Sequence, residues 1–162
     1  MPNFKSFRGT ITLISDFKIS VNDETGCYKL MSVQDGVGNV VNFVVSPTTY
    51  FVNHVTVTIG DSVTGYYDAD APTPMIYPPQ FRAIVIAKDT HHQNVKVDYF
   101  DSHLLSRDGN LKLNISQYTP ILLTNNQFFT KNPANRYLIV LYGPTTMSIP
   151  AQTTPYQVIV MC

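Results

Sequence analysis

Residues 27–45 read CYKLMSVQDGVGNVVNFVV. Two apolar runs flank the turn sequence Asp35-Gly36-Val37-Gly38-Asn39. Asp-Gly and Gly-Asn pairs accept the positive φ angles that tight hairpins require. The stretch therefore predicts two antiparallel strands, over 27–33 and 40–45, and it guides the interpretation of the chain on either side.

The segments around this hairpin also alternate apolar and polar residues, which is typical of strands that bury one face. The chain is rich in Val, Thr, Tyr, Phe and Ile, and Glu24 is its single glutamate. Long helices normally use Glu, Lys, Ala and Leu to cover their exposed face. We therefore expect an all-β protein with little helix. Strands of the first half are predicted over 10–19, 27–33, 40–45, 55–59, 63–67 and 82–88.

The second half of the chain repeats this pattern with shorter connections. Strands are predicted over 95–99 and 111–115, with the turn Arg107-Asp108-Gly109-Asn110 between them. Several matches in one order favour an internal duplication over chance. The matching segments are 41–46 with 111–116, 63–67 with 138–142, and 83–86 with 158–161.

The order of these elements resembles the OB fold, a small Greek-key β-barrel of five strands with a short element between the third and fourth. The resemblance covers residues 4–90 as a first barrel and 91–162 as a second, in tandem. It implies a groove across the second and third strands of each barrel. OB folds hold oligonucleotides, oligosaccharides or proteins in that groove, and the fold does not choose among them.

The balance of charge weakens the case for an oligonucleotide as the ligand. The chain carries 11 basic and 11 acidic side chains and has no net charge, so it has no long-range field that would attract phosphates. The charges are unevenly placed, with a balance of −3 over residues 1–81 and +3 over 82–162. We therefore expect no nucleic-acid partner. The uneven charges are either scattered and solvated, or they favour contact between the halves or between copies of the chain.

No apolar run reaches the roughly 18 residues that a membrane helix needs, and the N-terminus lacks the apolar core of a signal peptide. We expect no membrane insertion. The location in the cell stays open between the cytoplasm and release or assembly by a route without a signal peptide.

Catalytic and metal-binding motifs are missing from the sequence. It contains no GxSxG turn, no phosphate-binding glycine loop and no HExxH spacing. The neighbouring His91 and His92 would point to opposite faces of a strand, and the Asp68-Ala69-Asp70 segment lacks the rest of a calcium loop. We therefore predict no enzyme activity, no cofactor and no metal site.

Aromatic side chains are the best candidates for binding a ligand or partner. Tyr66 and Tyr67 are neighbours on a predicted strand, so one should enter the core and the other should face outward. Tyr77 and Phe81 flank a pair of prolines that can present a ring to a sugar, a base or a protein. The alternative is that these four residues are packing aromatics of the core and loops.

Cys27 and Cys162 are the two cysteines of the chain. Their spacing excludes a structural zinc site of the CxxC type, whereas a disulfide within the chain or between chains stays open.

Together these features favour a non-enzymatic β-barrel protein that associates with itself or with another protein, as in a bacterial surface or spore layer. Strand edges left unpaired in small barrels can join chains in such assemblies. The alternative is a module that binds an oligosaccharide or single-stranded nucleic acid through an aromatic groove.

Overall fold

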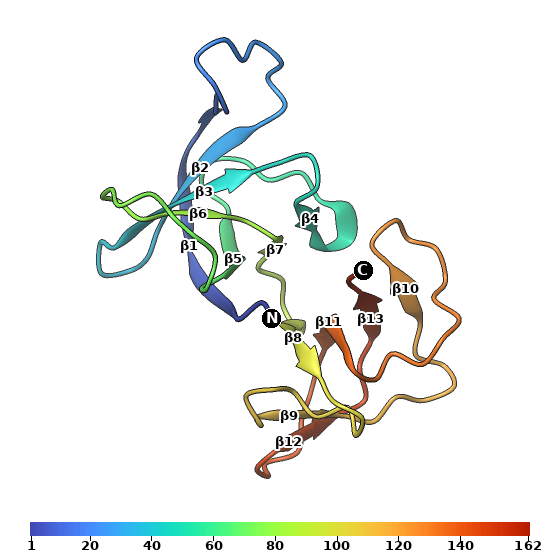
Figure 1. Ribbon diagram of the computed structural model, residues 1–162. Coiled ribbons are helices and arrows are strands. Elements are labelled where there is room, and N and C mark those ends of the chain that lie inside the picture. The colour runs from blue at the N-terminus through green and yellow to red at the C-terminus, as the bar shows by residue number, and fades with distance from the viewer. The chain divides into compact units, whose positions relative to one another are not determined.

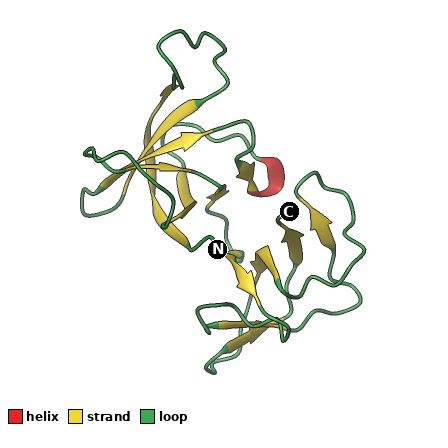
Figure 2. Cartoon of the chain, viewed as in Figure 1, coloured by secondary structure: helices red, strands yellow, loops and turns green.

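The computed structural model describes residues 1–162 and is all-β, as predicted (Figures 1 and 2). The chain divides into two compact units, Met1–Asp89 (unit 1) and Thr90–Cys162 (unit 2). The one helical element is the short 3-10 turn η1, Val52–His54. The strands form open sheets of seven, four and two strands, and no sheet closes into a barrel, in contrast to the predicted barrels.

Unit 1 holds the seven-stranded sheet, in the order β4-β7-β5-β1-β2-β3-β6. Strand β1 is long because it has two partners: its first part pairs with β5 and its second part with β2, and Thr10 takes part in both pairings. The predicted hairpin is confirmed, since β2 and β3 pair antiparallel from Lys29↔Val45 to Gln34↔Val40. The strands are β1 (Phe4–Asp16), β2 (Lys29–Gln34), β3 (Val40–Val45), β4 (Tyr50–Phe51), β5 (Ser62–Asp68), β6 (Gln80–Arg82) and β7 (Val85–Lys88).

The segment 80–88 reaches two strands that lie far apart in the sheet order. Its first part, β6, pairs parallel with β3, and its second part, β7, pairs antiparallel with β5. Between them, the amide of Ala83 donates to the Val44 carbonyl at 3.0 Å, and the amide of Ile84 donates to the Tyr66 carbonyl at 2.8 Å. One short segment therefore connects both sides of unit 1.

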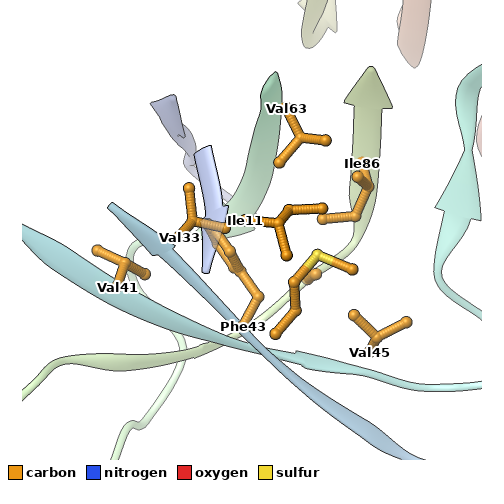
Figure 3. Close-up of a cluster of buried hydrophobic side chains, with 9 residues drawn as sticks. Ile11, Val33, Val41, Phe43, Val45, Val63 and Ile86 are labelled. Atoms are coloured by element: carbon orange, nitrogen blue, oxygen red, sulfur yellow. The ribbon is translucent and has the colours of Figure 1, made fainter. Parts of the chain in front are cut away.

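The core of unit 1 is built from the inward-facing positions of these strands (Figure 3). Phe43 is fully buried at its centre, and its ring occupies the space beside Gly65, where a Cβ would lie 2.5 Å from Phe43 Cζ. Glycine at this position is therefore required by the close approach of the ring. The buried cluster consists of Ile11, Met31, Val33, Val41, Phe43, Val45, Val63, Ala83 and Ile86.

The predicted strand over 55–59 is wrong, because this segment forms a loop without a strand partner. Val57 packs against the core of unit 1, whereas Ile59 is exposed. The alternation of apolar residues here reflects partial burial of a covering loop. Only pairing with a neighbour would have made it a strand.

Unit 2 holds the four-stranded sheet β10-β13-β11-β8 and the two-stranded sheet β12-β9. Strand β11 pairs antiparallel with β8 and with β13, while β10 pairs parallel with β13 and β9 pairs parallel with β12. A separate core surrounds Phe100, Leu138, Val140 and Val158. The strands are β8 (Asn94–Phe100), β9 (Leu111–Leu113), β10 (Ile121–Leu123), β11 (Arg136–Tyr142), β12 (Ala151–Thr153) and β13 (Gln157–Val160).

Aspartate side chains hold several turns of both units. Asp61 accepts a hydrogen bond from the amide of Thr58 at 2.8 Å, and Asp101 accepts from the amides of His103 and Leu105 at 2.8 and 3.1 Å. These bonds stabilise the ionised carboxylates. The amide of Thr58 lowers the pKa of Asp61, and the amide of Leu105, followed by that of His103, lowers the pKa of Asp101.

Acidification is expected to destabilise the fold from about pH 4 downward, near the pKa of an aspartate in an unfolded chain. With folded-state pKa values below that of the unfolded chain, Asp61 and Asp101 contribute fully above the unfolded pKa. That contribution is lost as the pH falls through the folded pKa values. Thermal melts from neutral pH to about pH 2.5 measure the loss. A double variant, Asp61→Asn with Asp101→Asn, should lose less thermal stability on acidification than the wild type. Equal losses would contradict this assignment.

Candidate functional site

A groove opens on unit 1 beside strands β3 and β6. Its volume is about 310 Å³. Two loops form its walls, namely the 17–28 connection between β1 and β2 and the proline-rich loop that precedes β6. The lining residues are Ile19, Tyr28, Val44, Pro72, Thr73, Pro74, Gln80, Phe81 and Arg82.

Two of the four predicted aromatic residues come together in unit 1. The ring of Tyr67 stacks on that of Phe81, with centroids 3.9 Å apart and planes within 4°. The ring centroid of Tyr67 also lies 6.2 Å from that of Phe43. Tyr67 packs against the core, and this burial raises its pKa. Of this pair, only Phe81 reaches the groove. The stack is therefore mainly packing at one end of the core.

The other two predicted aromatics lie outside this stack. Tyr66 is half-buried on the opposite face of β5 from Tyr67, as the alternation of a strand requires. Tyr77 is 85% exposed in the loop before β6. It does not line the groove, so the structure divides the four residues among a core stack, a second strand face and a loop.

The sequence interpretation missed an apolar loop tip next to Tyr77. Met75 is fully exposed and Ile76 is also exposed. In unit 2, Met147 and Ile149 are exposed in the loop that precedes β12. Each loop therefore exposes two large apolar side chains, of a kind that is more often buried. A run of Met, Ile and Tyr between prolines is the sequence pattern that could have revealed it.

Unit 2 contains a larger and more polar cavity of about 450 Å³. Lys96 lies in its wall and forms an ion pair with Asp108. Tyr142 contributes a half-buried phenol whose pKa is raised, first by burial and further by Asp108, with Lys96 acting in the opposite direction. The lining residues are Asn94, Lys96, Asn110, Leu111, Tyr142, Gly143, Pro144, Thr145 and Ala151.

A third hollow, of about 270 Å³, lies on unit 1 beneath the loop that replaces the predicted strand. Ile14, Met31, Val45 and Phe51 form most of its floor and walls, with Val55 and Val57 from the loop. It is a continuation of the core surface and carries few polar groups.

Of the remaining polar candidates, only Asp68 has hydrogen bonds that give it a structural role. Asp68 accepts hydrogen bonds from the amides of Asn3 and Asp70, each at 3.0 Å, and so holds a turn. The rings of His91 and His92 lie 6.3 Å apart, and no three metal-binding side chains come together. Cys27 and Cys162 are exposed free thiols.

No helix of the structure has the length and apolar character needed to cross a bilayer. Comparison of the chain with family models, with curated proteins and with solved structures finds no match.

Proposed function

We propose that the chain is a non-catalytic assembly protein made of two related OB-like units, and that it associates with further copies of itself through the loop that precedes the last strands of each unit. The relation between the units rests on their strand registers. The association rests on apolar residues exposed at the same place in both loops.

Equivalent strands pair in the same register in both units. The parallel pair Asn42↔Gln80 of unit 1 corresponds to Lys112↔Gln152 of unit 2. The antiparallel pair Val63↔Lys88 corresponds to Leu138↔Val160. This register aligns Ile86 with Val158, three residues away from the match suggested by sequence alone. Agreement over several pairings supports a duplicated unit.

A turn after the third strand also recurs. In unit 1 the amide of Ser46 donates to Thr49 Oγ1 at 3.0 Å, and in unit 2 the amide of Ser116 donates to Thr119 Oγ1 at 3.2 Å. Local side-chain bonds of this kind fix the direction of the chain as it leaves a strand. The shared turn therefore supports the same relation.

The loops themselves are related in sequence. Residues 72–81 read PTPMIYPPQF and residues 144–153 read PTTMSIPAQT, with identical residues at five of the ten positions. Met75 and Met147 fall at one of these positions, and both are fully exposed. A methionine exposed at the same position of both units is the observation that carries the proposal, because such flexible apolar side chains adapt to protein surfaces.

The charges of the units favour a protein partner and, among proteins, a second copy. Unit 1 contains six basic and eight acidic side chains, a balance of −2, and unit 2 contains five and three, a balance of +2. A negatively charged unit would be repelled by phosphates or by an anionic membrane. Opposite balances would instead draw unit 1 of one chain toward unit 2 of another, and contacts of this head-to-tail kind build rings or filaments.

Light scattering over a concentration series tests this association. The wild-type chain is expected to rise above its monomer mass of 18.2 kDa as concentration increases, with and without reductant. The double variant Met75→Ser with Met147→Ser should stay a monomer. The matched control Val37→Ser removes an apolar residue that is also exposed, from the hairpin turn of unit 1, and should behave like the wild type.

A wild-type chain that stays at 18.2 kDa at every concentration would overturn the proposal. Association that disappears with reductant would assign it to the thiols of Cys27 and Cys162 instead of the loops. Binding of a monomeric chain to neutral phosphatidylcholine vesicles would show that the loop tips contact lipid, and it would likewise contradict the proposal.

A further inference from the structure

Under the proposed relation of the units, two positions that hold aromatic rings in unit 1 lie in or next to the polar cavity of unit 2. By strand register, Phe7, which pairs with Gly65, corresponds to Lys96, which pairs with Val140. Phe81, which pairs with Phe43, corresponds to Thr153, which pairs with Leu113. Unit 2 thus has shorter or polar side chains at two positions that hold rings in unit 1.

The phenol of Tyr142 is consequently free of a stacking partner. Its counterpart in unit 1, Tyr67, has one face covered by Phe81. Tyr142 instead lines an open cavity together with two asparagines and a threonine. A cavity of about 450 Å³ falls in the size range of small-ligand sites, and an aromatic wall with a few fixed polar groups is their usual composition.

The cavity is polar but has no uncompensated charge. Its one cation, Lys96, is three-quarters buried and is paired with Asp108. Asp108 is also held by the hydroxyl of Ser106 at 2.6 Å and by the amide of Asn110 at 3.0 Å, so this carboxylate is fixed in place. The pair presents both a donor and an acceptor without attracting an anion, because the two charges cancel.

The remaining lining groups have hydrogen-bonding capacity to spare. Asn94 uses its amide only for a long contact of 3.5 Å to the carbonyl of Gly143. No hydrogen bond or ion pair ties down the side chains of Asn110 and Thr145. Amide and hydroxyl groups can donate and accept at once, which matches the hydroxyl groups of a sugar.

From this lining we propose that unit 2 binds a neutral saccharide in the cavity formed by Asn94, Lys96, Asn110, Tyr142, Thr145 and Ala151. The asparagine amides and the Lys96–Asp108 pair hydrogen-bond the sugar hydroxyls, and the ring of Tyr142 packs on the apolar C–H face of the sugar. Pro144 and Thr145, at the base of the loop proposed for self-association, line the site, whereas the exposed Met147 at its tip does not.

Amide NMR spectra of the ¹⁵N-labelled full chain, titrated with single neutral disaccharides, test the site. The probes are maltose, cellobiose, lactose and N,N′-diacetylchitobiose, with inorganic phosphate as the anion control. At least one sugar is expected to give saturable shifts confined to residues 94–96, 108–111, 142–145 and 151, and phosphate should give none there. The loop-tip double variant Met75→Ser with Met147→Ser should bind the same sugar equally well.

Two variants link the shifts to the cavity. Ala151→Leu adds bulk to its wall and is expected to weaken sugar binding by about tenfold or more, whereas Gln117→Ala, an exposed position elsewhere in unit 2, should leave the affinity unchanged. If Ala151→Leu fails to fold, Asn94→Ala provides the same comparison. Shifts from phosphate alone, no saturable shift from any of the sugars, or equal affinity in the cavity variants would each overturn the proposal.

Discussion

The substitution Gly65→Val is expected to destabilise unit 1 by about 3 kcal/mol, the upper end of the usual range for overpacking a core. A Cβ at this position would lie 2.5 Å from Phe43 Cζ and 2.6 Å from Cε2, and the Phe43 ring is fully buried (Figure 3). The better strand propensity of valine returns at most about 1 kcal/mol. Urea unfolding of the full chain, with hydrogen exchange of the unit 1 amides as the readout, measures this loss of stability.

A second substitution, Phe43→Leu, should restore most of that loss. Under the proposed relation of the units, the equivalent positions of unit 2 are Val140 and Leu113, so unit 2 would already combine the larger strand residue with the smaller core residue. Phe43→Leu alone should cost about 1–2 kcal/mol, below the 3–5 kcal/mol of a Phe→Ala change, because a smaller cavity remains. A double variant no more stable than Gly65→Val alone would contradict the proposed relation between the two units.

Local sequence predicts the elements that depend on local chemistry. The hairpin of β2 and β3 follows from its turn, where Asp35 accepts hydrogen bonds from the amides of Val37 and Asn39 at 3.0 and 2.9 Å. Alternation also places Tyr66 and Tyr67 on opposite faces of β5. In both cases the deciding interactions lie within a few residues of each other.

The arrangement of the sites could not be predicted in this way. The stack of Tyr67 on Phe81 depends on the return of a long proline-rich loop, and alternation within either strand contains no information about that return. The cavity of unit 2 combines Lys96 from β8, Tyr142 from β11 and Ala151 from β12. Their proximity is set by pairing between distant strands. The strand predicted over 55–59 is wrong for the same reason. Alternation indicates which side chains are buried, but it does not indicate which strand the segment would pair with.

Replacing Phe100 by alanine (Phe100→Ala) is expected to destabilise unit 2 by about 4 kcal/mol and to leave unit 1 folded. Phe100 is fully buried at the end of β8 and belongs to a core that includes residues of unit 2 alone. Net stabilities of small domains begin at about 5 kcal/mol, so a loss of this size exposes much of unit 2 to exchange. Hydrogen exchange with mass spectrometry should show lost protection over β8, β11 and β13 and retained protection over β1, β2 and β5.

Ile11→Ala is the matched control, because Ile11 is fully buried in the core of unit 1, as Phe100 is in the core of unit 2. It should give the reverse pattern of protection. Loss of protection in both units from either change would mean that they unfold as one body. With separate unfolding, Phe100→Ala should abolish sugar binding by the unit 2 cavity while leaving the Met75 loop of unit 1 in place. The two proposed activities could then be lost one at a time.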